Sequence, residues 1–166
     1  MSDKWTERWL DRAASLAAWS KDPSTKVGAV LVRESRAISE GYNGFPVGFA
    51  DTPERLDDRT LKYALTVHAE ANAVAFAARS GISTRGTALY TTFPVCPNCA
   101  TLVIQAGVQS VIVGAALIRR DWIERTEQGL AVFREAAIPY DLSRVAVDRG
   151  GYAVEAVALL ASLRDR

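Results

Sequence analysis

The residues best suited to chemistry are also the scarcest: His68 is the single histidine of the 166-residue chain, and Cys96 and Cys99 are its two cysteines. A Cys-x-x-Cys spacing is too short for a comfortable structural disulfide and, in a reducing compartment, indicates metal or redox chemistry. One imidazole and two thiolates supply three protein ligands. A catalytic zinc site keeps its fourth position for water, whereas a structural site is usually closed by four ligands. The set therefore favours a catalytic Zn²⁺ ion, one per subunit.

Glu70 follows two positions after His68, close enough to serve the same site. A bound zinc ion lowers the pKa of water to about 7, which makes a hydroxide nucleophile available at neutral pH. We expect Glu70 to take the proton of that water and to return it to a substrate nitrogen and a leaving amine. The alternative is a non-catalytic zinc module used for interaction, in which Glu70 closes the site as a fourth ligand.

The composition is that of one globular domain, predicted over 1–166: 49% of the residues are hydrophobic and 23% are charged, with a formal net charge of +1. No block of like charges indicates a long nucleic acid or an anionic membrane as a partner. No stretch approaches the about 20 apolar residues of a membrane span, and residues 1–14 lack the apolar core of a signal peptide. We therefore expect a cytoplasmic protein.

Strands and helices alternate after an initial helix and hairpin, and these elements must position the chemical residues. The order predicts a single α/β domain, a three-layer α/β/α arrangement with a central mixed sheet of about five strands. His68 and Cys96 fall near the starts of two predicted helices, so two helix N-termini can face one point. Helices are predicted over 3–21, 67–79, 97–105, 123–136 and 152–163, and strands over 27–33, 37–42, 87–91, 111–113, 139–142 and 144–147.

Two further expectations concern a loop and two tryptophans. Segment 43–61 is rich in glycine, proline and mixed charges and is predicted to be a long loop, a kind of segment that is usually functional or mobile. In the first helix, Trp5 and Trp9 share the spacing of the apolar face. They are predicted to lie in the core.

Four motifs between residues 20 and 114 resemble the cytidine deaminase-like superfamily, and within it the deoxycytidylate (dCMP) deaminases. His-Ala-Glu and Cys-x-x-Cys are shared by the whole superfamily and form a pattern of zinc deaminases. The motifs that begin at Ser20 and Gly41 are the ones that indicate the dCMP deaminases within it. The motifs are Ser-Lys-Asp-Pro-Ser-Thr-Lys-Val-Gly-Ala-Val from Ser20, Gly-Tyr-Asn-Gly-Phe-Pro from Gly41, Val-His-Ala-Glu-Ala-Asn-Ala-Val from Val67, and Cys-Pro-Asn-Cys-Ala from Cys96 with Ile-Gln-Ala-Gly-Val from Ile104.

The resemblance implies the cytidine deaminase-like fold and hydrolytic deamination of dCMP to dUMP with release of ammonia. Zinc would be held by His68, Cys96 and Cys99, with Glu70 moving protons during attack on C4 of cytosine. The backbone N–H of Ala69 resembles the donor that holds the pyrimidine carbonyl.

Nucleoside and phosphate recognition rest on other residues. Asn43 resembles the asparagine that contacts the nucleoside; its alternative is a turn residue in the left-handed region. Ser24, Thr25 and Lys26 present two hydroxyls and an ammonium just before a strand, a sensible place for a monophosphate. The alternative for each of these three is a solvated turn that ends the first helix.

The same family implies partners beyond the substrate. Related enzymes are commonly homo-oligomers, often hexamers, and some are regulated by dCTP and dTTP. Some also hold a second zinc on extra Cys and His residues, which this chain lacks.

One departure from the family pattern leaves the substrate open. Val95 stands directly before Cys96, where the superfamily usually has proline, and Pro94 comes one place earlier. This change alters the approach of the backbone to the base. The alternative function is therefore the same chemistry on cytosine, guanine, cytidine or adenosine, free or in nucleic acid, although the near-neutral charge disfavours a polymer.

Overall fold

Five strands form the central sheet in a computed structural model that describes residues 3–114, 116–118, 122–142, 144–148 and 153–155. The strand order is β2-β1-β3-β4-β6, with β1 antiparallel to β2 and β3, and β4 parallel to β3 and β6. The predicted mixed sheet is therefore confirmed. Its strands are β1 (Gly28–Arg33), β2 (Arg36–Tyr42), β3 (Ala88–Thr91), β4 (Ser110–Val113) and β6 (Tyr140–Asp141).

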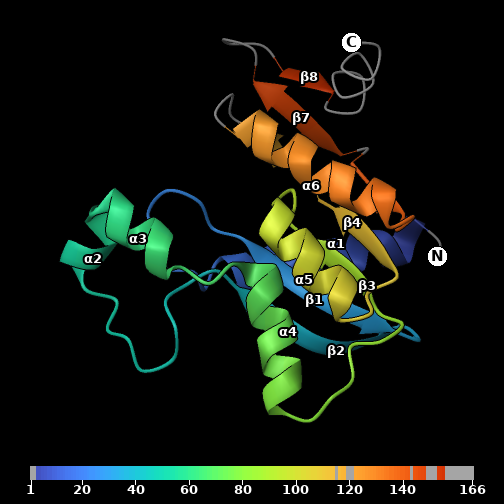
Figure 1. Ribbon diagram of the computed structural model, residues 1–166, viewed down its shortest axis with the longest axis horizontal. Helices are drawn as coiled ribbons and strands as arrows, with labels where there is room; N and C mark the ends of the chain where they lie inside the picture. The colour runs from blue at the N-terminus through green and yellow to red at the C-terminus, as the bar shows by residue number, and fades with distance from the viewer. Residues whose placement is uncertain (1–2, 115, 119–121, 143, 149–152, 156–166) are drawn as a thin grey trace.

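Helices cover both faces of the sheet, which confirms the three-layer prediction (Figure 1). Ala29 and Leu31 of β1 pack with the helices of one face, while Val30 and Val32 pack under the helix of the other. A strand covered on both faces reads as a continuous apolar run, as β1 does. The first face carries α4 (Ala69–Arg79), α5 (Pro97–Gln105) and α6 (Ile123–Glu135), which packs on α5, and the second face carries α1 (Asp3–Ala17).

The first helix is shorter than predicted, and its first tryptophan lies outside the core. Helix α1 ends at Ala17, whereas 3–21 was expected. Trp9 packs against the cluster under α1, but Trp5 is 37% exposed and stacks on Trp9 with ring centroids 6.1 Å apart. The prediction for Trp5 is wrong because the cluster begins at Trp9, so the turn before it extends past the apolar contacts.

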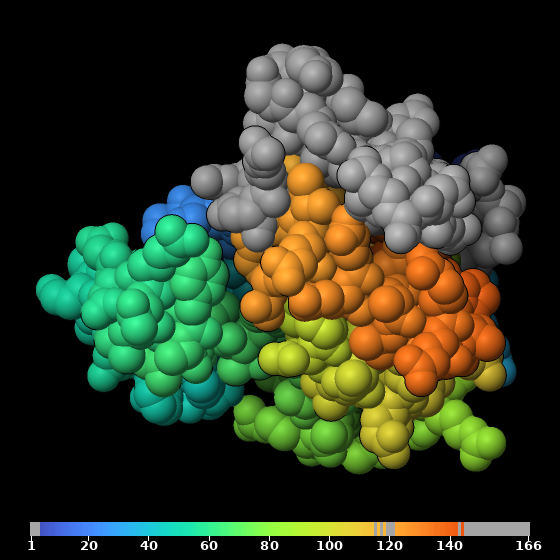
Figure 2. Space-filling model, turned by 45° about the horizontal axis from the view of Figure 1, so that its top comes forward, coloured from blue at the N-terminus to red at the C-terminus, as the bar shows by residue number. Residues whose placement is uncertain are grey.

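The segment predicted as a long loop contains two short helices. They are α2 (Pro53–Asp57) and α3 (Arg59–Leu65), and the side chain of Asp58 caps α3 by accepting the N–H of Leu61 at 2.9 Å. Both helices stand away from the sheet, and segment 43–65 forms a lobe beside the body in Figures 1 and 2. The sequence did not predict these two helices because each is too short to show a repeating apolar pattern among the mixed charges of the segment.

A second sheet lies in the last part of the chain. It has the order β5-β7-β8 and consists of β5 (Ala116–Ile118), β7 (Val145–Asp148) and β8 (Ala153–Glu155). The strand predicted over 144–147 corresponds to β7, whereas β5 was not predicted. The helix predicted over 152–163 is contradicted at β8, and its other residues lie outside the described ones. Local propensity favours a helix there, but β8 pairs antiparallel with β7, and such pairing overrides propensity.

No helix within the described ranges is both long and apolar enough to span a membrane.

Candidate active site

The metal-ligating side chains of two helix starts meet at one point. His68 is the N-cap residue of α4, Cys96 is the N-cap residue of α5, and Cys99 lies in the first turn of α5. The Nδ1 atom of His68 is 3.5 Å from each of the two Sγ atoms. The three donor atoms all lie within 4.8 Å of one another, and both sulfurs are buried. The fold thus brings together the three residues that the sequence singles out.

The spacing of these donor atoms suits zinc. A tetrahedral ion with bonds of about 2.3 Å to sulfur and about 2.0 Å to nitrogen holds a sulfur and a nitrogen about 3.5 Å apart. The measured separations of 3.5 Å agree with this value. Two soft thiolates and one imidazole are also the ligand chemistry that zinc prefers. The site therefore fits a zinc ion with three protein ligands.

The ligands influence one another's protonation. The contact with the thiol of Cys99, followed by that with His68, lowers the pKa of Cys96 to about 3. The same sulfur contact and burial raise the pKa of Cys99. The contact with Cys96 raises the pKa of His68. A metal ion would displace the protons of the thiols and of the imidazolium, because it binds thiolates and neutral imidazole.

Glu70 lies in the first turn of α4, beside the ligands, with 3% of its surface exposed. Burial is the main cause that raises its pKa above the usual value for a carboxyl group. A carboxyl group accepts and donates protons most effectively when its pKa lies near the working pH, so a raised pKa suits proton transfer at neutral pH. The geometry and the burial of Glu70 thus suit a proton carrier.

A cleft opens from these residues toward α3. Phe93 and Trp122 line it as an edge-to-face pair with ring centroids 5.5 Å apart, and Tyr63 and Asn43 line other parts of the cleft. Aromatic walls with a few polar groups are typical of small-molecule sites. The cleft lies between the lobe of segment 43–65 and the body of the protein.

Asn43 serves as a clamp at the edge of this cleft. Its side-chain oxygen accepts the N–H of Val27 at 2.7 Å, and its amide nitrogen donates to the carbonyl oxygen of Thr25 at 2.9 Å. The backbone φ of Asn43 is not positive, so the left-handed turn alternative is wrong. One N–H and one lone pair of the amide remain for a ligand, because each end can make two hydrogen bonds.

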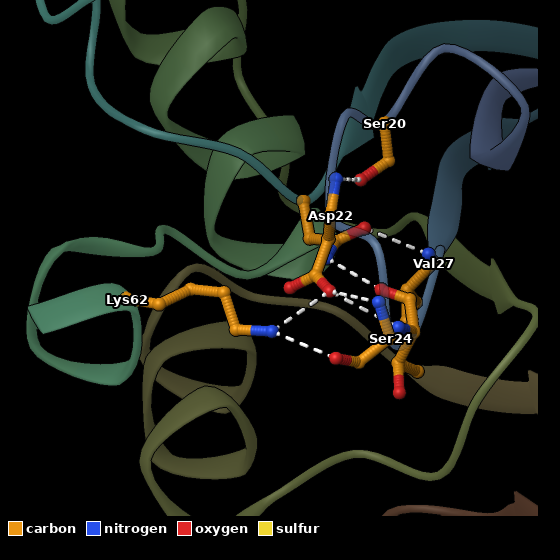
Figure 3. A network of polar contacts seen from close by, with 7 residues as sticks. Ser20, Asp22, Ser24, Val27 and Lys62 are labelled. Atoms are coloured by element: carbon orange, nitrogen blue, oxygen red, sulfur yellow. Dashed lines mark hydrogen bonds and ion pairs between the residues drawn. The ribbon is translucent and has the colours of Figure 1, made fainter. Parts of the chain in front are cut away.

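Lys62 of α3 is a candidate site residue that sequence reasoning missed. Only 5% of its surface is exposed, and its Nζ atom donates to Asp22 Oδ1 at 3.1 Å and to Ser24 Oγ at 2.9 Å (Figure 3). Asp22 Oδ1 also accepts the N–H groups of Ser24 and Thr25. The network ties α3 to the turn after α1. A single lysine in a charged segment carried no signal for this role.

The predicted phosphate residues do not all reach the cleft. Ser24 and Thr25 line it together with Lys62, whereas exposed Lys26 lines a neighbouring hollow of about 1250 Å³. Ser24, Thr25 and Lys62 also border that hollow, and so does Arg59. Lys62 thus borders both the cleft and the neighbouring hollow, whereas Lys26 and Arg59 border the hollow alone.

Helix α6 presses on the backbone that carries Cys96. Gly129 lies in this helix, and a Cβ atom there would overlap the carbonyl oxygen of Val95. Glycine inside a helix costs about 1 kcal/mol relative to alanine, so the close approach explains its presence. Ala69 is placed similarly, because a Cβ atom on Gly41 of β2 would overlap its carbonyl oxygen.

We predict that Gly129→Ala destabilises the protein by about 1–3 kcal/mol, the usual cost of overpacking, despite the better helix propensity of alanine. The cost arises because either α6 or the Val95 carbonyl must move. Urea unfolding of Gly129→Ala and of the neighbouring exposed control Gln128→Ala measures it. Equal stability of the two variants would show that α6 yields without cost.

Comparisons with known proteins agree with this geometry. The sequence profile of a family described as the cytidine and deoxycytidylate deaminase zinc-binding region matches residues 3–115. An uncharacterised deaminase of Aliivibrio fischeri is 43% identical over 111 residues, which cover 67% of this chain and 73% of that protein. The deoxycytidylate deaminase of Mus musculus is 37% identical over 117 residues, which cover 66% of this chain and 64% of that enzyme. The chain thus spans less than two thirds of the mouse enzyme's length.

A solved structure is similar over most of the chain. The dCMP deaminase of cyanophage S-TIM5, in complex with dCMP and dUMP, superimposes with a TM-score of 0.70 at 26% identity. The superposition covers 85% of this chain and 98% of that one. Helix α6 and strand β6 follow the part matched by the family profile, yet both reach the residues around Cys96.

Proposed function

The chain belongs to the cytidine and deoxycytidylate deaminase family, whose members are zinc-dependent enzymes, and we propose that it converts dCMP and water into dUMP and ammonia. One observation carries the proposal. A single cleft is lined by His68, Cys96 and Glu70 and also by Ser24 and Lys62. A nucleoside monophosphate has the matching polarity, a reactive base at one end and a dianion at the other.

Glu70 moves the protons of the reaction. His68, Cys96 and Cys99 would hold the zinc ion, which would lower the pKa of water and so make a nucleophile available at neutral pH. The carboxylate of Glu70 accepts a proton from the attacking water and donates it to N3 of the pyrimidine. It then carries the second proton to the amino group on C4, which leaves as ammonia. The burial that raises the pKa of Glu70 makes both transfers easier at neutral pH.

The first turn of α4 orients the base, and Asn43 orients the sugar. The side chain of the N-cap residue His68 makes no capping hydrogen bond, and the N–H of Ala69, the first residue of α4, has no carbonyl partner within the helix. We assign the N–H of Ala69 to the pyrimidine carbonyl oxygen and the remaining amide groups of Asn43 to the deoxyribose. Both residues line the cleft.

The phosphate is assigned to Ser24 and Lys62, with Lys26 at the outer edge. Lys62 is nearly buried and held by Asp22, so its ammonium is fixed in direction before a ligand arrives. A fixed cation loses less side-chain entropy on binding than an exposed one. Lys26 is exposed and contributes through longer-range attraction only.

Release of ammonia by zinc-loaded protein tests the proposal against dCMP, CMP, deoxycytidine, dCTP, cytosine, guanine and adenosine. Turnover that is strongest with dCMP is the expected result. Faster turnover of a free base or nucleoside would keep the zinc chemistry but contradict the phosphate assignment. Silence with every compound while zinc is bound would contradict the proposal and favour a nucleic-acid substrate or the non-catalytic module.

We predict that Lys62→Met lowers kcat/KM for dCMP by about 10–100-fold, the usual loss of a charge-assisted hydrogen bond. The value for deoxycytidine should change little, because that substrate has no phosphate. Steady-state kinetics with both substrates measure the difference. The control is Lys21→Met, which removes an exposed lysine paired with Asp51 at 2.8 Å. An equal loss on both substrates would mean that Lys62 only supports the fold.

We also propose the assembly, the regulation and the location of the protein. Phe76 of α4 and Leu102 of α5 are exposed apolar side chains on the two helices that carry the zinc ligands, which favours a homo-oligomer, and we propose a hexamer. Light scattering of the purified protein measures the assembly. Addition of dCTP or dTTP to the dCMP assay tests regulation. Free thiolate ligands need a reducing compartment, which supports a cytoplasmic location.

A further inference from the structure

The backbone N–H of Val95 sits directly before a metal ligand and is completely buried. Val95 has 0% of its surface exposed. A buried N–H group without a partner is costly, so nearly all of them are hydrogen-bonded in native structures. The N–H of Val95 donates to the hydroxyl oxygen of Tyr140 at 3.0 Å. The partner is a side chain 45 residues further along the chain.

Tyr140 is held firmly enough to act as a fixed acceptor. Its ring stacks on Phe133 of α6 with centroids 4.8 Å apart and an interplanar angle of 23°. Its backbone belongs to β6, which pairs with β4 through Val111. Burial raises the pKa of Tyr140, so the hydroxyl stays neutral. Two packed elements thus fix the position of this hydroxyl.

Val95 is confined from a second side as well. Gly129 of α6 approaches the carbonyl oxygen of Val95 so closely that no side chain fits between them. The hydroxyl of Tyr140 therefore fixes the N–H of Val95, while α6 restricts the position of the Val95 carbonyl oxygen. The backbone between these two restraints leads straight into Cys96, whose φ and ψ of −72° and 163° present its thiolate at the start of α5.

We infer that Tyr140 is a positioning residue for the metal ligand Cys96: its hydroxyl fixes the Val95 backbone and thereby the direction of the Cys96 sulfur. The inference rests on the proposed zinc site but not on the identity of the substrate. Partners that orient metal ligands without touching the metal typically change metal affinity or activity by about 10–100-fold. Tyr140 touches neither substrate nor zinc in this role.

Tyr140→Phe tests the inference, with Tyr90→Phe as its control. Tyr90 is also buried, but it packs under α1 on the opposite face of the sheet. We expect Tyr140→Phe to release zinc to a colorimetric chelator about 10-fold faster than Tyr90→Phe. The visible spectrum of the cobalt-substituted protein should shift in Tyr140→Phe alone, and kcat for ammonia release should fall with KM unchanged. Identical zinc release and spectra in the two variants would overturn the inference.

The Val95→Pro substitution provides a second test, because proline has no N–H to donate. In a Val95→Pro background, Tyr140→Phe should change zinc release by less than about 2-fold, since the bond is already absent. In the matched Val95→Ala background, which keeps the N–H, the full effect should return. An undiminished effect of Tyr140→Phe in the Val95→Pro background would mean that the hydroxyl acts elsewhere.

Hydrogen exchange decides the question if Val95→Pro does not fold. The Val95 amide should be protected in the parent protein and in Tyr90→Phe, and should exchange faster in Tyr140→Phe. Equal protection in all three proteins would contradict the inference. Failure of the proposed function looks different, because the parent protein would then bind no zinc or release no ammonia.

Discussion

Glu70→Gln is expected to lower kcat for ammonia release by about 10²–10⁴-fold, the usual contribution of a general acid or base. The amide keeps the size of the carboxylate but can neither accept a proton from water nor deliver one to the pyrimidine nitrogen. Glu70 is almost completely buried beside the triad, so no bulk-water carrier takes its place easily. Single-turnover kinetics with dCMP measure the loss at the chemical step.

Zinc content separates this role from its alternative. A proton carrier can be lost without loss of metal, so Glu70→Gln should bind as much zinc as the parent protein. Glu135→Gln, an exposed change on α6, is the matched control and should retain both zinc and activity. If Glu70→Gln loses zinc together with stability, Glu70 is a fourth ligand and the non-catalytic module is the correct interpretation.

Cys99→Ala is expected to abolish stable zinc binding. Two ligands would remain from a set of three, and the cost should exceed the about 10–100-fold that follows loss of an outer partner. Cys99 is buried in the first turn of α5, with its sulfur 3.5 Å from Nδ1 of His68. Elemental analysis of the purified protein gives the zinc content per chain.

Thermal unfolding gives an independent measure of the same change. A ligand that binds only the native state stabilises it by about 2.7 kcal/mol at 100 times its dissociation constant. A chelator should therefore lower the Tm of the parent protein and leave that of Cys99→Ala unchanged. Asn98→Ala alters an exposed neighbour on the same helix and should behave like the parent. Full zinc retention by Cys99→Ala would exclude Cys99 as a ligand.

Residue type and local spacing were enough to predict the metal-ligating group. His68 with Glu70, and Cys96 with Cys99, are each separated by two or three positions, so one helical turn places each pair. Donor chemistry does not depend on the fold, since an imidazole and two thiolates favour zinc wherever they meet. The local pattern also predicted a strand over 27–33, which corresponds to β1.

Only the tertiary structure decided which distant residues complete the site. Lys62 meets Asp22 and Ser24 across 40 and 38 positions, and Tyr140 meets Val95 across 45. Neither lysine nor tyrosine differs locally from others of its type in the sequence. Their roles arise because α3 folds back over the turn after α1, and because β6 joins the sheet beside β4.

The exposure of Trp5 and the strand at β8 have the same physical origin. A local pattern predicts which side of an element is apolar, but not where the neighbouring element ends or which backbone pairs with it. The cluster under α1 begins at Trp9, and β8 forms because β7 offers it an edge. The sequence by itself thus predicted the metal-ligating residues and the layered fold. The packing of distant segments decided how those groups are held, because such contacts depend on the whole chain rather than on nearest neighbours.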